Sequence, residues 1–278
     1  MVTTLISGLP GKMATEIVKE IEKHDDINIL PCGFSSERNA GNVYQTPNGN
    51  VISLLGPSER EKILKLPEVQ PLDAGYRRVI GVDASTPSAG TENALWFAEN
   101  YIPFVLLTTG VDYDKIEEKV EDSNICAVIS PNMSPEITVI NAMLEYAAKQ
   151  FPKAWEGMEG IIKESHQQGK KDTSGTAKKN KANLEKLGVG VKDIIPIRDP
   201  SYQKLLLKVP EEHLGGHGWH TYAMQTPGGD VYIEIRHNVN GRETYARGTI
   251  LAIYYLDHKM MEGERGKVYS MEDVLRGI

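Results

Sequence analysis

The sequence predicts an α/β protein, with a doubly wound parallel sheet first and an α+β domain with an open mixed sheet second. Three observations lead to this fold class. The first half alternates short β-branched runs with stretches that carry apolar residues at helical spacing. A glycine-containing turn follows the first run. After residue 131 this alternation gives way to strand-like runs joined by a hairpin turn.

The first domain is expected to contain five short strands, at residues 3–7, 27–34, 78–84, 103–109 and 125–130. Helices are expected between them at residues 12–23, 87–100 and 113–121. Because strands that alternate with helices form βαβ units, these strands should lie parallel, with helices on both faces of the sheet.

The second domain is expected to begin with a long helix at residues 134–151 and a strand at 158–164, which leads into a polar loop. A helix at 174–187 should end at Gly188, and Pro227-Gly228-Gly229 should join two antiparallel strands at 217–226 and 230–237. The helix at 242–258 is expected to pack back on the first domain. We therefore predict a dinucleotide-binding domain of residues 1–131 and 241–278, and a substrate-binding and oligomerisation domain of residues 132–240.

Composition limits the classes of function. With 38 acidic and 31 basic residues the formal charge is −7, which argues against broad affinity for nucleic acid. Cys32 and Cys126 lie in apolar runs and are expected to be reduced core thiols. The first residues lack the pattern of a signal peptide and no run is apolar enough to cross a membrane, so we expect a cytoplasmic protein, or a plastid one if a transit peptide has been removed.

The turn at residues 7–13 follows the first strand and opens the first helix, which is typical of the Rossmann fold. Gly8 and Gly11 stand where the backbone must approach a pyrophosphate closely, and the helix start offers unpaired N–H groups to the anion. A tight turn can need glycine for other reasons, but the βαβ context favours a dinucleotide.

The end of the second strand indicates which nicotinamide cofactor is used. Ser35 and Ser36 can donate to a ribose 2′-phosphate, and Arg38 can supply its counter-charge. Glu37 is the alternative, since an acidic residue there can accept from the free 2′-hydroxyl of NADH. We expect NADPH to be preferred, with NADH as a second cofactor.

The polar loop at residues 164–177 gathers groups suited to proton transfer and carboxylate binding. His166 is the nearby side chain whose ordinary pKa suits proton transfer near neutral pH. Lys170 adds a positive charge, and residues 174–176 (Ser-Gly-Thr) place hydroxyl and N–H groups at a helix start. An exposed loop with a serine N-cap is the alternative that spacing leaves open.

A metal site is not expected. His213, His217 and His220 fit no standard zinc spacing, and the glycines between them suggest a loop.

The motifs taken together resemble the dihydrodipicolinate reductase family across nearly the whole chain. The family pattern E-x-H-[HQ]-x-x-K-x-D followed by S-G-T-A is matched from Glu164 to Ala177. Residues 8–13 resemble its glycine turn, 82–87 its strand corner, 108–110 its T-T-G loop and 132–134 its N-F-S loop. Residues 237–248 are similar to its H-x-x-x-x-R-x-x-[FY]-A-x-G segment.

Three departures mark where this resemblance transfers less directly. Gln167 replaces a second histidine, and the loop from Asp172 to Ser174 is one residue shorter than D-x-P-S; both features resemble the plant-type branch. Ala84 and Leu107 replace the usual phenylalanine and glycine near the nicotinamide.

The resemblance implies reduction of 4-hydroxy-tetrahydrodipicolinate, via dihydrodipicolinate, to tetrahydrodipicolinate, a step of lysine and diaminopimelate biosynthesis, by a homotetramer. It implies catalytic roles for His166, as the acid, and Lys170. It implies a substrate site formed by Gln167, Lys170, Ser174, Gly175, Thr176 and Arg242. It implies a cofactor site formed by Gly8, Leu9, Pro10, Gly11, Lys12, Met13, Ser35, Ser36, Arg38, Ser85, Thr86, Thr108, Thr109, Gly110, Pro131, Asn132 and Met133.

Two other functions fit parts of the sequence. A related Rossmann reductase or dehydrogenase could act on another imine, amino acid or aldehyde, because a fold does not fix a substrate. A non-catalytic NADPH-binding sensor would need the glycine turn but would have no use for His166 or Lys170.

Overall fold

The computed structural model describes residues 1–72 and 75–277, which divide into two compact units. Unit 1 comprises Met1–Pro135 and Tyr245–Ile278, and unit 2 comprises Glu136–Thr244. Each unit has its own buried apolar core. In the part of the chain that the structure describes, no helix is long and apolar enough to cross a membrane.

Unit 1 is built around a nine-stranded sheet in which all pairings are parallel except that of β4 with β5. The strand order is β13-β8-β7-β6-β1-β3-β5-β4, and β2 also pairs with β1. The strands are β1 (Val2–Ser7), β2 (Ile27–Ile29), β3 (Cys32–Phe34), β4 (Val43–Gln45), β5 (Val51–Leu55), β6 (Ile80–Asp83), β7 (Phe104–Leu106), β8 (Cys126–Ile129) and β13 (Lys267–Tyr269). The predicted doubly wound parallel sheet is confirmed.

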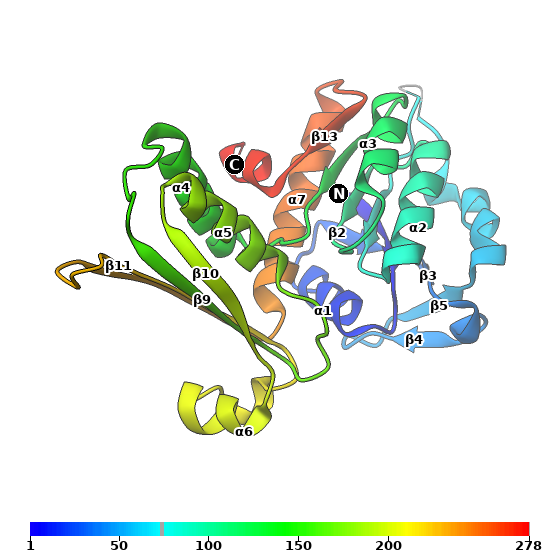
Figure 1. Cartoon of the computed structure of the whole chain (residues 1–278). Coiled ribbons are helices and arrows are strands. Elements are labelled where there is room, and N and C mark those ends of the chain that lie inside the picture. Colours follow the sequence, from blue (N-terminus) through cyan, green and yellow to red (C-terminus); the bar gives the residue numbers. More distant parts are fainter. Residues whose placement is uncertain (73–74, 278) are drawn as a thin grey trace. The chain divides into compact units, whose positions relative to one another are not determined.

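Helices cover both faces of this sheet, with α2 and α3 on one face and α1 and α7 on the other (Figure 1). The α-helices of unit 1 are α1 (Lys12–Ile21), α2 (Pro87–Glu99), α3 (Tyr113–Glu121), α7 (Glu243–Met261) and α8 (Met271–Arg276). Short 3₁₀ segments are η1 (Glu37–Asn39), η2 (Pro57–Lys65) and η3 (Pro67–Val69). Cys32 and Cys126 are buried free thiols, as predicted.

The strand expected at residues 27–34 is two strands rather than one. β2 ends at Ile29 and β3 begins at Cys32, with Leu30 and Pro31 between them. Proline cannot donate to a sheet ladder, so it interrupts the pairing. β4, β5 and the 3₁₀ segments, which the sequence reading did not identify, lie between β3 and β6.

Unit 2 is a four-stranded mixed sheet covered on one face by two helices, as Figure 1 shows. The strand order is β10-β9-β11-β12. The elements are α4 (Pro135–Gln150), β9 (Glu159–His166), α5 (Gly175–Lys186), β10 (Gly190–Ile197), α6 (Pro200–Tyr202), the π-helical η4 (Gln203–Leu207), η5 (Glu211–His213), β11 (His217–Gln225) and β12 (Tyr232–Asn240). This confirms the predicted α+β domain with an open mixed sheet.

Several features of unit 2 differ from the sequence prediction. β10, which is parallel to β9, was not predicted, and neither were α6, η4 and η5. β9 extends to His166 instead of ending at residue 164, because its last residues pair with β11, where Gly218 is the partner of His166. His166 therefore belongs to a strand end and not to a free loop.

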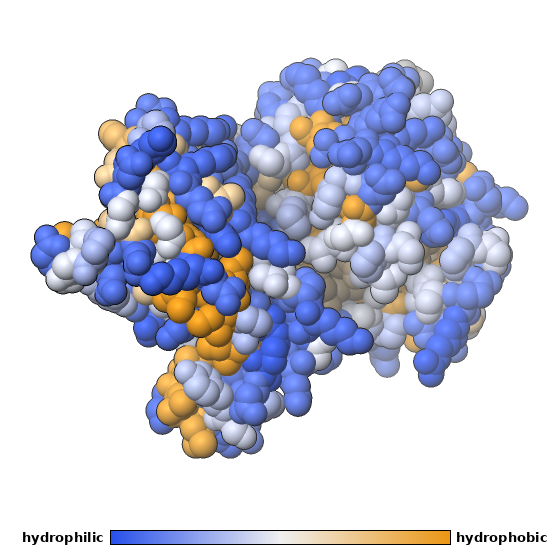
Figure 2. Space-filling view, in the orientation of Figure 1, coloured by the Kyte–Doolittle hydropathy of each residue, from blue (hydrophilic) through white to orange (hydrophobic). Residues whose placement is uncertain are grey.

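The sheet face opposite α4 and α5 is open. It carries side chains such as Ile161, Trp219 and Tyr232, and a hollow on it is bordered by residues of α6 and η4. Figure 2 shows apolar side chains gathered over this face. Tyr232 and Leu206 are 59% and 65% exposed, so the face leaves large apolar groups in water.

Candidate active site and cofactor edge

The five segments expected to bind the cofactor all follow the carboxyl ends of parallel strands of unit 1. These strands, β3, β1, β6, β7 and β8, are consecutive neighbours in the sheet. The strand order changes direction at β1, between β3 and β6, and ligands of open α/β sheets bind at such a point. The segments are residues 8–13 after β1, 35–38 after β3, 85–86 after β6, 108–110 after β7 and 131–133 after β8.

The turn after β1 needs both glycines for steric reasons. Gly8 has a φ of +104°, and a Cβ there would lie 2.4 Å from the carbonyl oxygen of Ala84. A Cβ on Gly11 would lie 2.6 Å from the carbonyl oxygen of Gly8. Gly11 is the N-cap of α1, and no side chain of a described residue makes a capping hydrogen bond at this helix start. The first-turn N–H groups of α1 therefore suit a pyrophosphate.

Other residues of this turn differ in what they can offer a ligand. The side chain of Leu9 is buried in the core, so only its backbone can contact a cofactor. Pro10 and Lys12 are exposed, and Met13 is half-buried.

The segment after β3 contains one exposed cation. Arg38 is exposed and makes no ion pair among the described residues. The carboxylate of Glu37 instead accepts a hydrogen bond of 3.0 Å from the hydroxyl of Ser58. The hydroxyl of Ser35 donates to the carbonyl of Leu9, which ties this segment to the glycine turn. Ser36 is exposed.

A buried carboxylate organises the segments after β6 and β7. Asp83 accepts from the hydroxyls of Ser85 and Thr108, and from Asn93 at 2.6 Å. The side chains of Ser85 and Thr108 are thus part of a network that shapes the loops. Asp83 lies within residues 82–87, which resemble a family motif, but the sequence alone indicated no role for it because its burial depends on the neighbouring strands.

The remaining predicted cofactor residues lie at the same edge. Thr86, Thr109, Gly110 and Pro131 are exposed there, and Asn132 is half-buried. Met133 is only 1% exposed, so its side chain belongs to the core.

In unit 2, the end of β9 holds a buried carboxylate between two partners. The side chain of Glu164 is 0% exposed. Its oxygens accept from Nη2 of Arg198 at 2.6 Å and Nη1 at 3.2 Å, and one of them pairs with Nδ1 of His166. Burial alone would raise the pKa of Glu164, but the bonds from His166 and Arg198 outweigh it and lower that pKa. Glu164 is therefore ionised at neutral pH.

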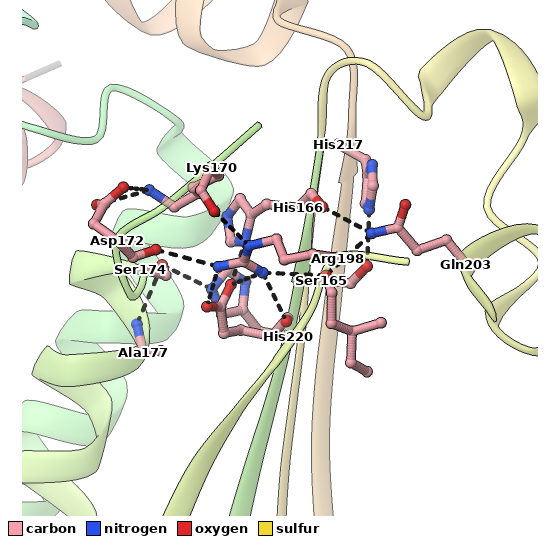
Figure 3. Close-up of polar contacts among 12 residues, drawn as sticks. Ser165, His166, Lys170, Asp172, Ser174, Ala177, Arg198, Gln203, His217 and His220 are labelled. Atoms are coloured by element: carbon pink, nitrogen blue, oxygen red, sulfur yellow. Dashed lines mark hydrogen bonds and ion pairs between the residues drawn. The ribbon is translucent and has the colours of Figure 1, made fainter. Parts of the chain in front are cut away.

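Arg198 also holds the backbone of the loop that follows β9, as Figure 3 shows. Its Nε donates to the carbonyl of Lys170 at 2.9 Å and its Nη2 to that of Asp172 at 3.2 Å. The sequence reading missed Arg198 because it follows β10, the strand that was not predicted.

Lys170 forms an ion pair with the exposed carboxylate of Asp172. Its Nζ lies 2.8 Å from both side-chain oxygens of Asp172. The side chain of Asp172 is 73% exposed and that of Lys170 20% exposed. Exposed ion pairs contribute little free energy, so a substrate carboxylate can replace Asp172.

The Ser-Gly-Thr turn begins α5, as predicted. Ser174 is the N-cap and accepts from the amide of Ala177 at 3.5 Å, and its Oγ lies 2.9 Å from Nε2 of His220. A Cβ on Gly175 would meet nothing within 4 Å, so the helix start is open beside it. Thr176 is half-buried.

Arg242 and Gln167 complete the predicted substrate set. The guanidinium of Arg242 lies against Gly216, where an added Cβ would be 2.6 Å from its Nη1. Gly216 precedes β11 by one residue, and Gly218 pairs with His166, so Arg242 is at the same end of the sheet as His166. The backbone carbonyl of Gln167 accepts from the amide of Lys170, and no described residue makes a hydrogen bond to its half-buried side chain.

Three buried histidines lie on the strands beside this site. Burial lowers the pKa of His220 to about 2 and that of His237 to about 4. Burial also lowers the pKa of His217, whose Nε2 lies 2.8 Å from the hydroxyl of Ser165. All three are neutral near pH 7. His217 and His220 are residues of β11, as the strand predicted at residues 217–226 implies.

Glu164, His166 and His220 place possible ligand atoms within 4.8 Å of one another. We assign no metal to them, because the guanidinium of Arg198 already pairs with Glu164 and would repel a cation. His220 has its Nε2 on Ser174, so a metal would have to break that contact as well.

Comparison with known proteins links both units to one family. The family model for the N-terminus of dihydrodipicolinate reductase matches residues 2–133, and the model for its C-terminus matches residues 136–275. 4-Hydroxy-tetrahydrodipicolinate reductase 2, chloroplastic, of Arabidopsis thaliana is 38% identical over 277 residues, covering 99% of this chain and 77% of the relative. A 4-hydroxy-tetrahydrodipicolinate reductase of Methanocaldococcus jannaschii is 27% identical over 293 residues, covering 99% of this chain and 97% of the relative.

A solved structure shares the fold of both units. Dipicolinate-bound dihydrodipicolinate reductase from Paenisporosarcina sp. TG-14 matches with a TM-score of 0.64 at 17% identity, covering 98% of this chain and 99% of that one. Since the two family models together account for nearly all of both units, this chain belongs to the dihydrodipicolinate reductase family.

Proposed function

We propose that this chain is an oxidoreductase that converts 4-hydroxy-tetrahydrodipicolinate to tetrahydrodipicolinate with NAD(P)H, as the names of its relatives describe. The reaction takes up a hydride and a proton and releases water and the oxidised cofactor. The observation that carries this proposal is the arrangement at the end of β9. The imidazole of His166 pairs there with the buried carboxylate of Glu164, in the same segment as Lys170 and the open start of α5. A protein that only bound the cofactor would not need this arrangement.

Unit 1 would hold the cofactor. Two features of unit 1 fit a dinucleotide. The start of α1 lacks a side-chain cap from any described residue, and the space around Gly8 is too small for a side chain, so only backbone can lie against the ligand there. When bound, the reduced nicotinamide supplies the hydride. The exposed guanidinium of Arg38, together with Ser36, supports a preference for NADPH over NADH, because Glu37 is held by Ser58.

Unit 2 would hold the substrate and supply the proton. His166 is the acid, and Lys170 with the helix start at Gly175 and Thr176 binds one carboxylate. Arg242, at the same end of the sheet, gives electrostatic support. Since Ser174 already binds His220 and caps α5, it contributes mainly by fixing that helix start.

We also propose that the chain forms a homotetramer through the open face of the unit 2 sheet. Large apolar side chains are exposed there, including Tyr232 and Leu206, and β12 is an edge strand. Burying this face against another copy would remove both the apolar surface and the unpaired edge from water. Light scattering at micromolar concentration tests this, and a monomeric mass would contradict it.

A cytoplasmic location of the protein remains a prediction, which imaging of the tagged chain can test.

One assay separates the proposed function from its two rivals. NADPH oxidation is followed after mixing the chain with the product that a synthase forms from aspartate semialdehyde and pyruvate. We expect rapid oxidation that depends on this product. Oxidation with other imines or aldehydes alone would favour a related reductase, and tight NADPH binding without any turnover would favour a sensor.

A further inference from the structure

The contacts of Glu164 determine which nitrogen of His166 carries a hydrogen. An ionised carboxylate can only accept hydrogen bonds. Its partner, Nδ1 of His166, must therefore be the donor. In the neutral ring this leaves Nε2 without a hydrogen, and in the protonated ring Nε2 carries the proton that can leave. Among the described residues none pairs with Nε2, so it is available to a substrate.

Arg198 joins this imidazole to the rest of the site. The same guanidinium that binds both oxygens of Glu164 also donates to the backbone carbonyl of Lys170, 28 positions away along the chain. The fork of five N–H groups on an arginine allows these contacts at once, which a lysine could not do. The ring of His166 and the backbone of Lys170 are thus fixed to one group.

We infer that Glu164 and Arg198 form a positioning pair, in which Glu164 holds His166 with its hydrogen on Nδ1 and Arg198 sets the spacing between His166 and Lys170. The inference rests on the proposed roles of His166 and Lys170, and it assigns roles to two residues that touch no substrate. A carboxylate that orients a catalytic imidazole in the same way is known from serine proteases.

Several other groups surround His166, and they must be considered when the pair is tested through pH. Arg198 faces it from the position directly after β10, and the loop after β9 contributes Lys170. The neighbouring strands contribute three neutral histidines, which are His217 and His220 from β11 and His237 from β12. Glu164 is the group among these that carries a negative charge next to the ring, so its removal should have the clearest effect on the protonated form.

The first test is Glu164→Gln, which keeps the shape of the side chain and removes its charge. We expect kcat to fall roughly 10- to 100-fold. The loss should be smaller than the full worth of a general acid, roughly 10² to 10⁴-fold, because Glu164 positions the proton donor and does not itself donate the proton. The high-pH limb of the kcat profile should move to lower pH, because the protonated ring loses its carboxylate partner. The KM for NADPH should change less than about 2-fold, since the variant lies outside unit 1.

A double variant guards against misfolding. Glu164→Gln alone leaves Arg198 without its carboxylate, whereas Glu164→Gln with Arg198→Met removes both charges, and replacing both partners is much less damaging than removing one. Nitrogen NMR of histidine-labelled protein then reports the hydrogen directly. Wild type should show neutral His166 with hydrogen on Nδ1, and the double variant a mixture of both forms.

The matched control uses the opposite end of the same two strands. Lys192 on β10 lies 2.6 Å from Glu159 on β9, and their side chains are 66% and 51% exposed. Glu159→Gln, alone and with Lys192→Met, should leave kcat, the pH profile and the His166 spectrum unchanged.

The outcomes separate this inference from the proposed function. If Glu164→Gln lowers kcat but moves neither the pH limb nor the NMR signal, the pair has only a structural role and the inference is wrong. Wild-type turnover in Glu164→Gln, while His166→Gln is inactive, would also overturn it and leave the proposed function standing. Normal turnover in His166→Gln would instead remove the acid role on which both depend.

Discussion

The cofactor edge of unit 1, formed by the segments after β1, β3, β6, β7 and β8 where we propose that the cofactor binds, and the end of β9 in unit 2 are built in opposite ways. At the cofactor edge, backbone groups and glycines would offer the binding surface, and the buried side chains of Leu9 and Met133 belong to the core. At the end of β9, the chemistry belongs to side chains, held by a network around the buried carboxylate of Glu164. Truncating side chains should therefore lower activity much more in unit 2 than in unit 1. Acid should also destabilise unit 2 before unit 1.

The largest effect is expected for His166→Gln, which keeps a polar side chain and removes the proton donor. The rate should fall by roughly 10² to 10⁴-fold, the usual worth of a general acid. NADPH affinity, measured by fluorescence titration, should barely change because the cofactor edge lies in unit 1. Near-normal turnover would mean that water or Lys170 supplies the proton, and the contrast between the two regions would then lose its main support.

Lys170→Ala should have the next largest effect. Truncating a cation that pairs with a substrate carboxylate should cost about 2 kcal/mol, or roughly 30-fold in kcat/KM. This is the low end of the range for such pairs, because the Lys170 side chain is 20% exposed. Gln167→Ala, in the same loop, should lose much less activity, since no hydrogen bond to a described residue fixes the Gln167 side chain. Steady-state kinetics in which both variants lost activity equally would argue against a specific carboxylate site at Lys170.

Acid should weaken unit 2 before unit 1. Burial lowers the pKa of His220 to about 2 and that of His237 to about 4, whereas an unfolded histidine titrates near pH 6.5. The unfolded chain therefore binds protons on these histidines that the folded chain does not bind. The free energy of unfolding falls as pH decreases from about 6.5 to 4. The loss approaches about 1.4 kcal/mol per pH unit for each histidine.

Hydrogen exchange of β11 and β1 amides at pH 7 and pH 5, corrected for intrinsic rates, measures this difference. The described residues of unit 1 include no buried histidine, so β1 is the internal reference. Equal loss of protection in both strands would show that the buried histidines do not control acid stability.

The smallest effect is expected for Arg38→Ala. The guanidinium is exposed, so its bond to a 2′-phosphate should be worth about 1 kcal/mol, or roughly 5-fold in relative affinity. The KM for NADPH should rise and that for NADH should not, which narrows the preference. Lys12→Ala, on the glycine turn, should weaken both cofactors alike. Equal constants for both cofactors in the wild type would refute the argument from the end of β3.

The sequence could predict unit 1 well because its signals are local. Alternation of strands and helices gives the parallel sheet, and the Gly8 turn reports a backbone conformation that few other residues adopt. The second strand is an exception: Pro31 splits it, and this was not predicted because the run around Pro31 is mostly apolar. β4 and β5 were missed since they are short and β4 is mostly exposed.

The site in unit 2 could be predicted only in part. His166, Lys170 and Ser174 occur close together in the sequence, so a single polar segment revealed them. Arg198 could not be found in this way, since it depends on the parallel pairing of β10 with β9, which brings Ile197 beside Ser165. The available signal was an arginine directly after the isoleucine-rich run at residues 194–197, but that run was not recognised as a strand.

The contact between Arg198 and Glu164 restricts how this sequence can change during evolution. A mutation at either position alone leaves a buried charge without its partner and is strongly destabilising. A lineage could cross that barrier only by altering both codons nearly together, or after the demand for the reaction had been lifted. We therefore expect relatives to keep both residues or to lack both. A relative with only one of them should be losing its reductase activity.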